Sequence, residues 1–104
     1  MRPVDREILL AFWKVHILHH AAKEPIHGQW IARELRHHGY DISPGTLYPI
    51  LGRMEQNGWL KRHGPDSPNP KARKSYRLTK AGRAVLEHIK ENTKELYREV
   101  VLDR

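Results

Sequence analysis

A proline-containing helical segment in the middle of the chain constrains the fold more than any other part of the sequence. Ser43 is a favourable N-cap, and Pro44 suits the first helical position, where its missing N–H is not needed. Four apolar side chains recur at helical spacing and predict one buried face: Leu47, Ile50, Leu51 and Met54. Asn57-Gly58 predicts the end of the helix, because glycine readily takes the left-handed conformation after a last turn. The chain therefore contains a short helix with one apolar face and an opposite face rich in hydroxyls.

Two helical segments precede this helix. Residues 5–22 predict a long first helix, broken by Lys23-Glu24-Pro25, and residues 28–38 predict a second helix, ended by Gly39. The apolar residues of the second helix that we expect to face inward are Trp30, Ile31 and Leu35. Residues 40–42 then form a short turn into the third helix, and two helices joined in this way form a helix-turn-helix.

Downstream of the third helix, the sequence predicts two strands with a long connection. The strands are residues 59–63 and 75–78. Residues 64–74 between them contain three prolines, a glycine and short polar residues, which exclude regular structure. The alternative is a disordered surface loop, but a position directly after a helix-turn-helix favours a wing. We therefore predict a mainly α fold with a small two-stranded β-wing, a winged helix-turn-helix.

The first and last helices carry more apolar surface than one small domain can cover. Thr79 is the predicted N-cap of a helix that runs to about residue 102. The residues of its predicted seam follow steps of three and four over about two heptads; they are Leu86, Ile89, Leu96 and Val100, with Thr93 between Ile89 and Leu96. The first helix is apolar on more than one face, so Ile8 and Phe12 are available to a second subunit. We expect a homodimer, with residues 1–78 as the DNA-binding domain and residues 79–104 as the dimerisation helix; packing of the last helix on its own domain is the alternative.

Length and charge limit the function further. The 104 residues make one small domain, and 19 Lys plus Arg against 12 Asp plus Glu give a net charge of +7, which favours a polyanionic partner such as double-stranded DNA. The absence of cysteine excludes disulfides and thiolate sites. No apolar run approaches the about 20 residues needed to span a bilayer, and the N-terminus is no secretion signal. We therefore expect a cytoplasmic protein without a membrane partner.

Three separated segments occur in an informative order: Ile26-His27-Gly28, the run from Ser43 to Pro49, and the run from Lys74 to Gly82. Together they resemble the PadR family of bacterial winged-helix transcriptional regulators. The resemblance covers most of the chain and implies a repressor that binds a palindromic operator as a homodimer. Because the last helix is single and short, the chain is similar to the compact form of that family.

The start of the third helix and the wing are the predicted DNA-contacting surfaces, and the resemblance supports both. Thr46 and Tyr48 lie in the first turns, the part of a recognition helix that reaches base edges. Tyr48 can donate to a phosphate or pack on a thymine methyl, and Ser43 can bond a phosphate or serve only as the cap. Arg53, one turn further, can reach a phosphate or remain solvated. The basic residues of the wing, which would contact the backbone or the minor groove, are Lys71, Arg73 and Lys74.

Two further expectations rest on the resemblance. The family commonly has a tyrosine after the His-Gly pair, where this chain has Gln29. Any DNA contact of that tyrosine is replaced here at most by a hydrogen bond that the Gln29 side-chain amide donates to a phosphate. PadR-like dimers can also bind small aromatic or lipophilic effectors between subunits. Phe12 and Trp13 are the candidate residues for such a pocket, although packing in the core and the dimer interface is the interpretation that we favour.

The eight histidines raise the question of a metal. His16 and His20 are spaced i, i+4, with His19 beside them, which suits zinc. No HExxH pattern or cysteine completes a site, and His37-His38 suits the negative end of a helix dipole, so we predict no metal and no cofactor. No catalytic motif is present, which indicates that the chain is not an enzyme. Two alternatives remain: a winged-helix interaction adaptor without specific DNA binding, and a histidine-based metal-responsive regulator.

Overall fold

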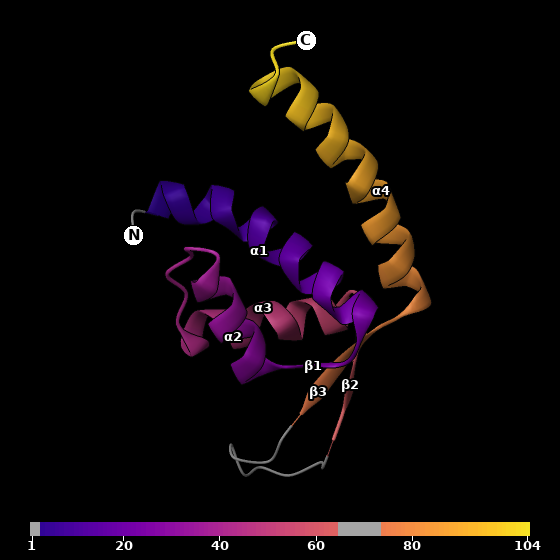
Figure 1. The fold of residues 1–104 in the computed structure, drawn as a ribbon. Coiled ribbons are helices and arrows are strands. Elements are labelled where there is room, and N and C mark those ends of the chain that lie inside the picture. Colours follow the sequence, from indigo (N-terminus) through magenta and orange to yellow (C-terminus); the bar gives the residue numbers. More distant parts are fainter. Residues whose placement is uncertain (1–2, 65–73) are drawn as a thin grey trace.

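The computed structural model describes residues 3–64 and 74–104, with side chains from residue 5. Within these ranges lie four α-helices, three strands and one π-helical turn (Figure 1). In order they are α1 (Pro3–Lys23), β1 (Ile26–His27), α2 (Gly28–His37), α3 (Pro44–Gln56), β2 (Leu60–His63), β3 (Ser75–Leu78), α4 (Lys80–Leu96) and a terminal π-helical turn η1 (Tyr97–Val101). The predicted helices and both predicted strands are confirmed, with ends that differ by at most about two residues except in the last helix. That helix was expected to run to about residue 102, but α4 ends at Leu96 and the chain continues as the π-helical turn η1.

The sheet has one strand more than predicted. β3 lies in the middle and pairs antiparallel with β2 on one side and with β1 on the other. Ile26 lies opposite Tyr76, and Leu60 lies opposite Leu78. The predicted two-stranded wing, β2 paired with β3, is therefore confirmed, and β1 adds a third strand to its sheet. A strand of two residues is too short to show an alternating pattern, and only its pairing with β3 defines it.

The hydrophobic core lies between α1, α2 and α3 and is closed by the sheet. The four residues of the predicted α3 stripe are all fully buried, so that prediction is confirmed. They pack with residues of α1, α2 and the strands that include Trp13, Ile17, Ile31, Leu35 and Leu60. Trp30 departs from the prediction, because it is exposed and its ring contacts His20 at the edge of α1, while Ile31 and Leu35 occupy the inward face of α2.

The predicted N-caps and the glycines after α2 and α3 stand at the helix ends, as expected. The Ser43 hydroxyl accepts a hydrogen bond from the backbone N–H of Thr46 at 3.3 Å, and the Thr79 hydroxyl accepts one from Gly82 at 2.9 Å. Gly39 and Gly58 follow α2 and α3 with φ of +91° and +81°, which a residue with a Cβ adopts only at a cost. These stops set the lengths of the two helices of the helix-turn-helix.

Helix α4 leaves the domain partway along its length. It begins beside the C-terminal end of α1 and then diverges from it, so that the C-terminus lies far from the other helices (Figure 1). Leu86 is 3% exposed and belongs to the core, whereas every residue from Glu91 onward is exposed. Leu86 was expected in a free seam; it faces its own subunit because the first turns of α4 pack on α1. None of the helices in the described ranges is both long and apolar enough to cross a membrane.

Candidate nucleic-acid interface

The face of α3 opposite its buried stripe presents the predicted DNA-reading side chains. Because the stripe is anchored in the core, the opposite face is held outward, with Tyr48 45% exposed and Arg53 exposed one turn further along. Thr46 is half-buried in the first turn. A polar face of this kind on a rigid helix is what insertion into a major groove requires.

Ser43 and Thr46 form a hydroxyl pair at the start of α3. The Ser43 hydroxyl donates to Thr46 Oγ1 at 3.2 Å while it accepts from the Thr46 backbone N–H. The Ser43 hydroxyl thus both donates and accepts a hydrogen bond within the first turn of α3. Thr46 accepts in this pair and keeps its own hydroxyl proton, so Thr46 is the better donor toward a phosphate.

Tyr48 rests on the first residue of α2. A Cβ added to Gly28 would lie 2.6 Å from Tyr48 Cε1 and 2.8 Å from its hydroxyl oxygen, closer than real side chains approach. Only glycine at position 28 therefore admits the tyrosine ring in this position. This contact joins two of the three motifs of the sequence, the His-Gly pair and the start of α3. Gln29 is exposed and follows Gly28 in the same first turn of α2.

The wing is described in part. Lys74 is half-buried, and its carbonyl oxygen lies 3.4 Å from Nδ1 of His27, where β1 meets β3. Lys71 and Arg73 lie outside the described residues. Tyr76 is buried, and burial raises the pKa of its phenol, which stays neutral at physiological pH.

The sheet carries cations that the sequence analysis did not single out. Lys61 of β2 and Arg77 of β3 are exposed and lie directly opposite one another in the ladder. Like charges on facing positions repel, and a bound anion relieves that repulsion. Burial does not alternate along β2, where Lys61, Arg62 and His63 are all exposed, so the two-residue period of a strand could not have identified this pair.

Most of the predicted dimerisation residues are exposed, and Leu86 alone of them is buried in the core. Phe12 of α1 is 46% exposed, and Leu96 and Val100 of the C-terminal segment are 55% and 69% exposed. Ile8 is exposed as well, and Ile89 is half-buried, whereas Leu86 lies in the core. The sequence analysis missed further exposed apolar side chains at the C-terminal end, which are Tyr97, Val101 and Leu102.

The two candidate effector residues do not share one environment. Trp13 is fully buried in the core, and among the described residues its indole N–H has no hydrogen-bond partner. Its ring meets the edge of Tyr40 with centroids 6.4 Å apart. Phe12 lies on the exposed side of α1. Trp13 is therefore a packing residue of the protomer, and Phe12 alone is open to a ligand or a partner.

Comparisons with known proteins agree with this architecture. Residues 17–88 match the model of the family described as the transcriptional regulator PadR-like family. The transcriptional regulator Rv3488 of Mycobacterium tuberculosis is 47% identical over 96 residues, which cover 92% of this chain and 89% of that protein. A PadR-like transcription factor from Bacteroides fragilis aligns with a TM-score of 0.79 at 26% identity, over 99% of this chain and 100% of its own. A PadR-like regulator from Bacillus cereus gives the same score and identity over 90% and 92%.

Proposed function

The chain belongs to the PadR-like family of transcriptional regulators, and from this premise we propose that it is a sequence-specific DNA-binding repressor that works as a homodimer. The observation that carries the proposal is the outward face of α3. There Thr46 and Tyr48 stand on a helix whose other face is fully buried, so their positions are rigid. The net charge of +7 supplies the attraction to the phosphate backbone.

In the proposed complex, α3 enters the major groove with its N-terminal turns toward the bases. Tyr48 donates to a phosphate or packs on a thymine methyl, and Thr46 donates to a phosphate. Ser43 mainly holds the helix start, Arg53 reaches the backbone one turn further, and Gln29 adds an amide contact from α2. The basic residues of the wing, Lys71, Arg73 and Lys74, contact the neighbouring backbone or minor groove.

A two-fold dimer would place two α3 helices in successive major grooves about 34 Å apart, which implies a palindromic operator. The exposed apolar residues of α1 and of the C-terminal segment support such a dimer, since together they form more apolar surface than a monomer of this size needs to expose. Repression follows from occupation of a promoter in the cytoplasm. A small aromatic or lipophilic effector beside Phe12 would alter the separation of the α3 helices and release the DNA.

Selection of bound sequences from random duplexes, with excess non-specific DNA as competitor, tests the proposal directly. We expect an enriched palindrome. Tyr48→Phe and Thr46→Ala should each weaken binding to it by about 1–3 kcal/mol and leave the thermal midpoint nearly unchanged. Lys94→Ala, which removes a cation from α4 rather than from α3, is the matched control and should lose only a small, sequence-independent part of the affinity. Equal binding to all duplexes would refute specific regulation and favour the adaptor.

A further inference from the structure

We propose that His16, His20 and His38 form a binding site for one divalent transition-metal ion of the zinc type, which links α1 to the end of α2. The site does not depend on the DNA-binding function proposed above. The sequence alone predicted no metal, because it showed only two suitably spaced histidines, His16 and His20. The fold adds His38 as the third ligand.

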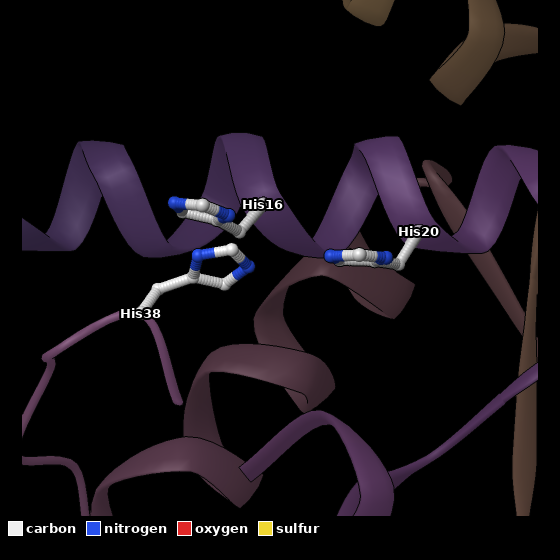
Figure 2. Close-up of side chains that lie close together, drawn as sticks. All are labelled: His16, His20 and His38. Atoms are coloured by element: carbon white, nitrogen blue, oxygen red, sulfur yellow. The ribbon is translucent and has the colours of Figure 1, made fainter. Parts of the chain in front are cut away.

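The fold brings the third histidine to the other two. His16 and His20 lie one turn apart on α1, and His38 is the C-cap residue of α2. Each of the three offers a ring nitrogen, and these nitrogens all lie within 4.8 Å of one another. In Figure 2 the rings of His16 and His20 project from α1 toward the ring of His38, which faces them from the end of α2. The ring centroids of His16 and His38 are 5.0 Å apart.

The donor set suits a particular class of ion. Imidazole nitrogen is a good ligand for Zn²⁺, Cu²⁺ and Ni²⁺, whereas Mg²⁺ and Ca²⁺ prefer oxygen. Tetrahedral Zn²⁺ with Zn–N bonds of about 2.0–2.1 Å needs nitrogens about 3.4 Å apart, so the rings must close by roughly an ångström. His38 can make this movement, because it stands at a helix end with 43% of its side chain exposed. Three protein ligands leave one coordination position for water or a further ligand.

A carboxylate completes the surroundings. Oε1 of Glu34 lies 3.2 Å from Nε2 of His38 and 3.9 Å from Nε2 of His20. A ligating histidine typically gives its other N–H to a carboxylate, which holds the ring in orientation, and Glu34 stands where it can do this. Its negative charge also offsets part of the charge of a bound cation.

Two of the three histidines are shifted toward the neutral form, in which imidazole binds metals. Burial is the largest cause and lowers the pKa of both His16 and His20. The neighbouring His38 lowers the pKa of His16 further and His19 that of His20, while Glu34 raises both. Aromatic packing alone is the competing explanation, because His16 also contacts Tyr40 and His20 contacts Trp30 edge-on. Packing does not account for a third imidazole whose nitrogen lies within 4.8 Å of the other two, or for a carboxylate beside His20 and His38.

The position of the site gives it a consequence for regulation, and this step rests on the proposed function. His38 directly precedes the turn that leads into α3, whereas His16 and His20 belong to a helix proposed for dimerisation. An ion bound to all three would hold α1 against the helix-turn-helix. If it binds the DNA-competent and DNA-free arrangements unequally, Zn²⁺ and DNA must change each other's affinity by the same factor.

Equilibrium dialysis of the untagged full chain against Zn²⁺ tests the site. We expect one Zn²⁺ per chain, displaced by Co²⁺ but not by excess Mg²⁺, and affinity reduced by more than about tenfold in His38→Gln. His88→Gln, at an exposed histidine of α4 outside the cluster, is the matched control and should bind as the parent chain does. Equal binding by the parent chain and by the His16→Gln/His20→Gln/His38→Gln variant would overturn the proposal.

Thermal unfolding provides a second readout that does not depend on dialysis. A ligand that binds only the folded state raises the midpoint, so Zn²⁺ should raise it by several degrees in the parent chain and in His88→Gln, but not in His38→Gln. Because His38 is exposed, this variant should fold normally, and its midpoint without Zn²⁺ checks that it does. An equal rise in all three proteins would overturn the site.

Operator affinity with and without Zn²⁺ tests the regulatory step separately. A change of severalfold that disappears in His38→Gln supports it. Unchanged affinity in a chain that binds both Zn²⁺ and a specific operator overturns that step, whereas failure to bind any specific DNA counts against the proposed function instead.

Discussion

The contact between Tyr48 and Gly28 explains at the level of single residues why two distant motifs occur together. The ring of the tyrosine occupies the space that a side chain at position 28 would need. Glycine is therefore required at position 28 because it leaves room for the Tyr48 ring. Its own backbone does not need glycine, since it does not take a positive φ. The orientation of Tyr48, the single aromatic side chain of α3, thus depends on the absence of a methyl group at position 28 of α2.

Gly28→Ala should weaken operator binding about as much as Tyr48→Phe does, with a change in unfolding free energy below about 1 kcal/mol. The stability change is small because Tyr48 is exposed enough to swing away and alanine is the better helix former. A double-mutant cycle with Tyr48→Ala measures the coupling: once the ring is gone, Gly28→Ala should have little further effect on DNA affinity. Additive losses would mean that position 28 acts independently of Tyr48.

At the scale of the elements, hydrogen bonds and close packing hold the junction of the sheet with α4. The Thr79 hydroxyl caps α4 and also donates to the carbonyl of Gly58, while the Thr79 N–H donates to the Trp59 carbonyl at 3.0 Å. One turn into the helix, a Cβ on Gly82 would overlap the Trp59 carbonyl oxygen and lie 2.7 Å from Leu78 Cδ1. These contacts fix the direction in which α4 leaves the domain.

Gly82→Ala should therefore lower the unfolding free energy by about 1–3 kcal/mol, because backbone must move to admit the methyl group. Gly52→Ala is the matched control: it lies in the interior of α3, and a Cβ there meets no atom within 4 Å. This control should raise stability by up to about 1 kcal/mol through helix propensity. Chemical denaturation of both variants gives the comparison, and an equal effect of the two would exclude close packing at Gly82.

The wing is expected to contribute charge rather than base recognition. Replacing Lys71, Arg73 and Lys74 together by alanine should weaken binding to all sequences and lower the slope of log affinity against log salt by about one unit for each lost phosphate contact. Titrations of operator and random duplex at several salt concentrations measure both quantities. An altered sequence preference with an unchanged slope would show that the wing reads bases.

On the scale of the whole molecule, α1 and the C-terminal segment present apolar surface that the protomer leaves in contact with solvent. Leu96 and Val100 lie in a stretch with no buried residue, well beyond the point where Leu86 joins the core. Such surface in a chain of 104 residues is typical of a subunit interface. We expect the dimer to form through this stretch, together with the exposed face of α1 around Phe12.

Leu96→Asp/Val100→Asp should convert the dimer to a folded monomer, because a two-fold interface places each new charge near its symmetry mate. Operator affinity should then fall further than for one wing substitution, since the second half-site loses its linkage to the first. Analytical ultracentrifugation and circular dichroism check mass and folding. A variant that remains dimeric would assign the interface to α1 alone.

Local sequence determined the elements of this protein. Caps at Ser43 and Thr79, stops at Gly39 and Gly58, and the periodicity of the α3 stripe act over a few residues, so the helices and both long strands could be predicted. These signals need no distant partner, because hydrogen bonds and torsion preferences within one turn supply them.

The tertiary structure alone decided which of these elements meet. The third strand exists only because Ile26 and His27 lie beside β3, and Leu86 is buried because α4 starts against α1. Gly28 lies against Tyr48, and His38 lies beside His16 and His20. These residues are too far apart in sequence for a helical or strand period to predict the contacts. Contacts of this kind arise when the core closes and brings separate helix faces together, and their physical cause lies in packing rather than in any local stretch of chain.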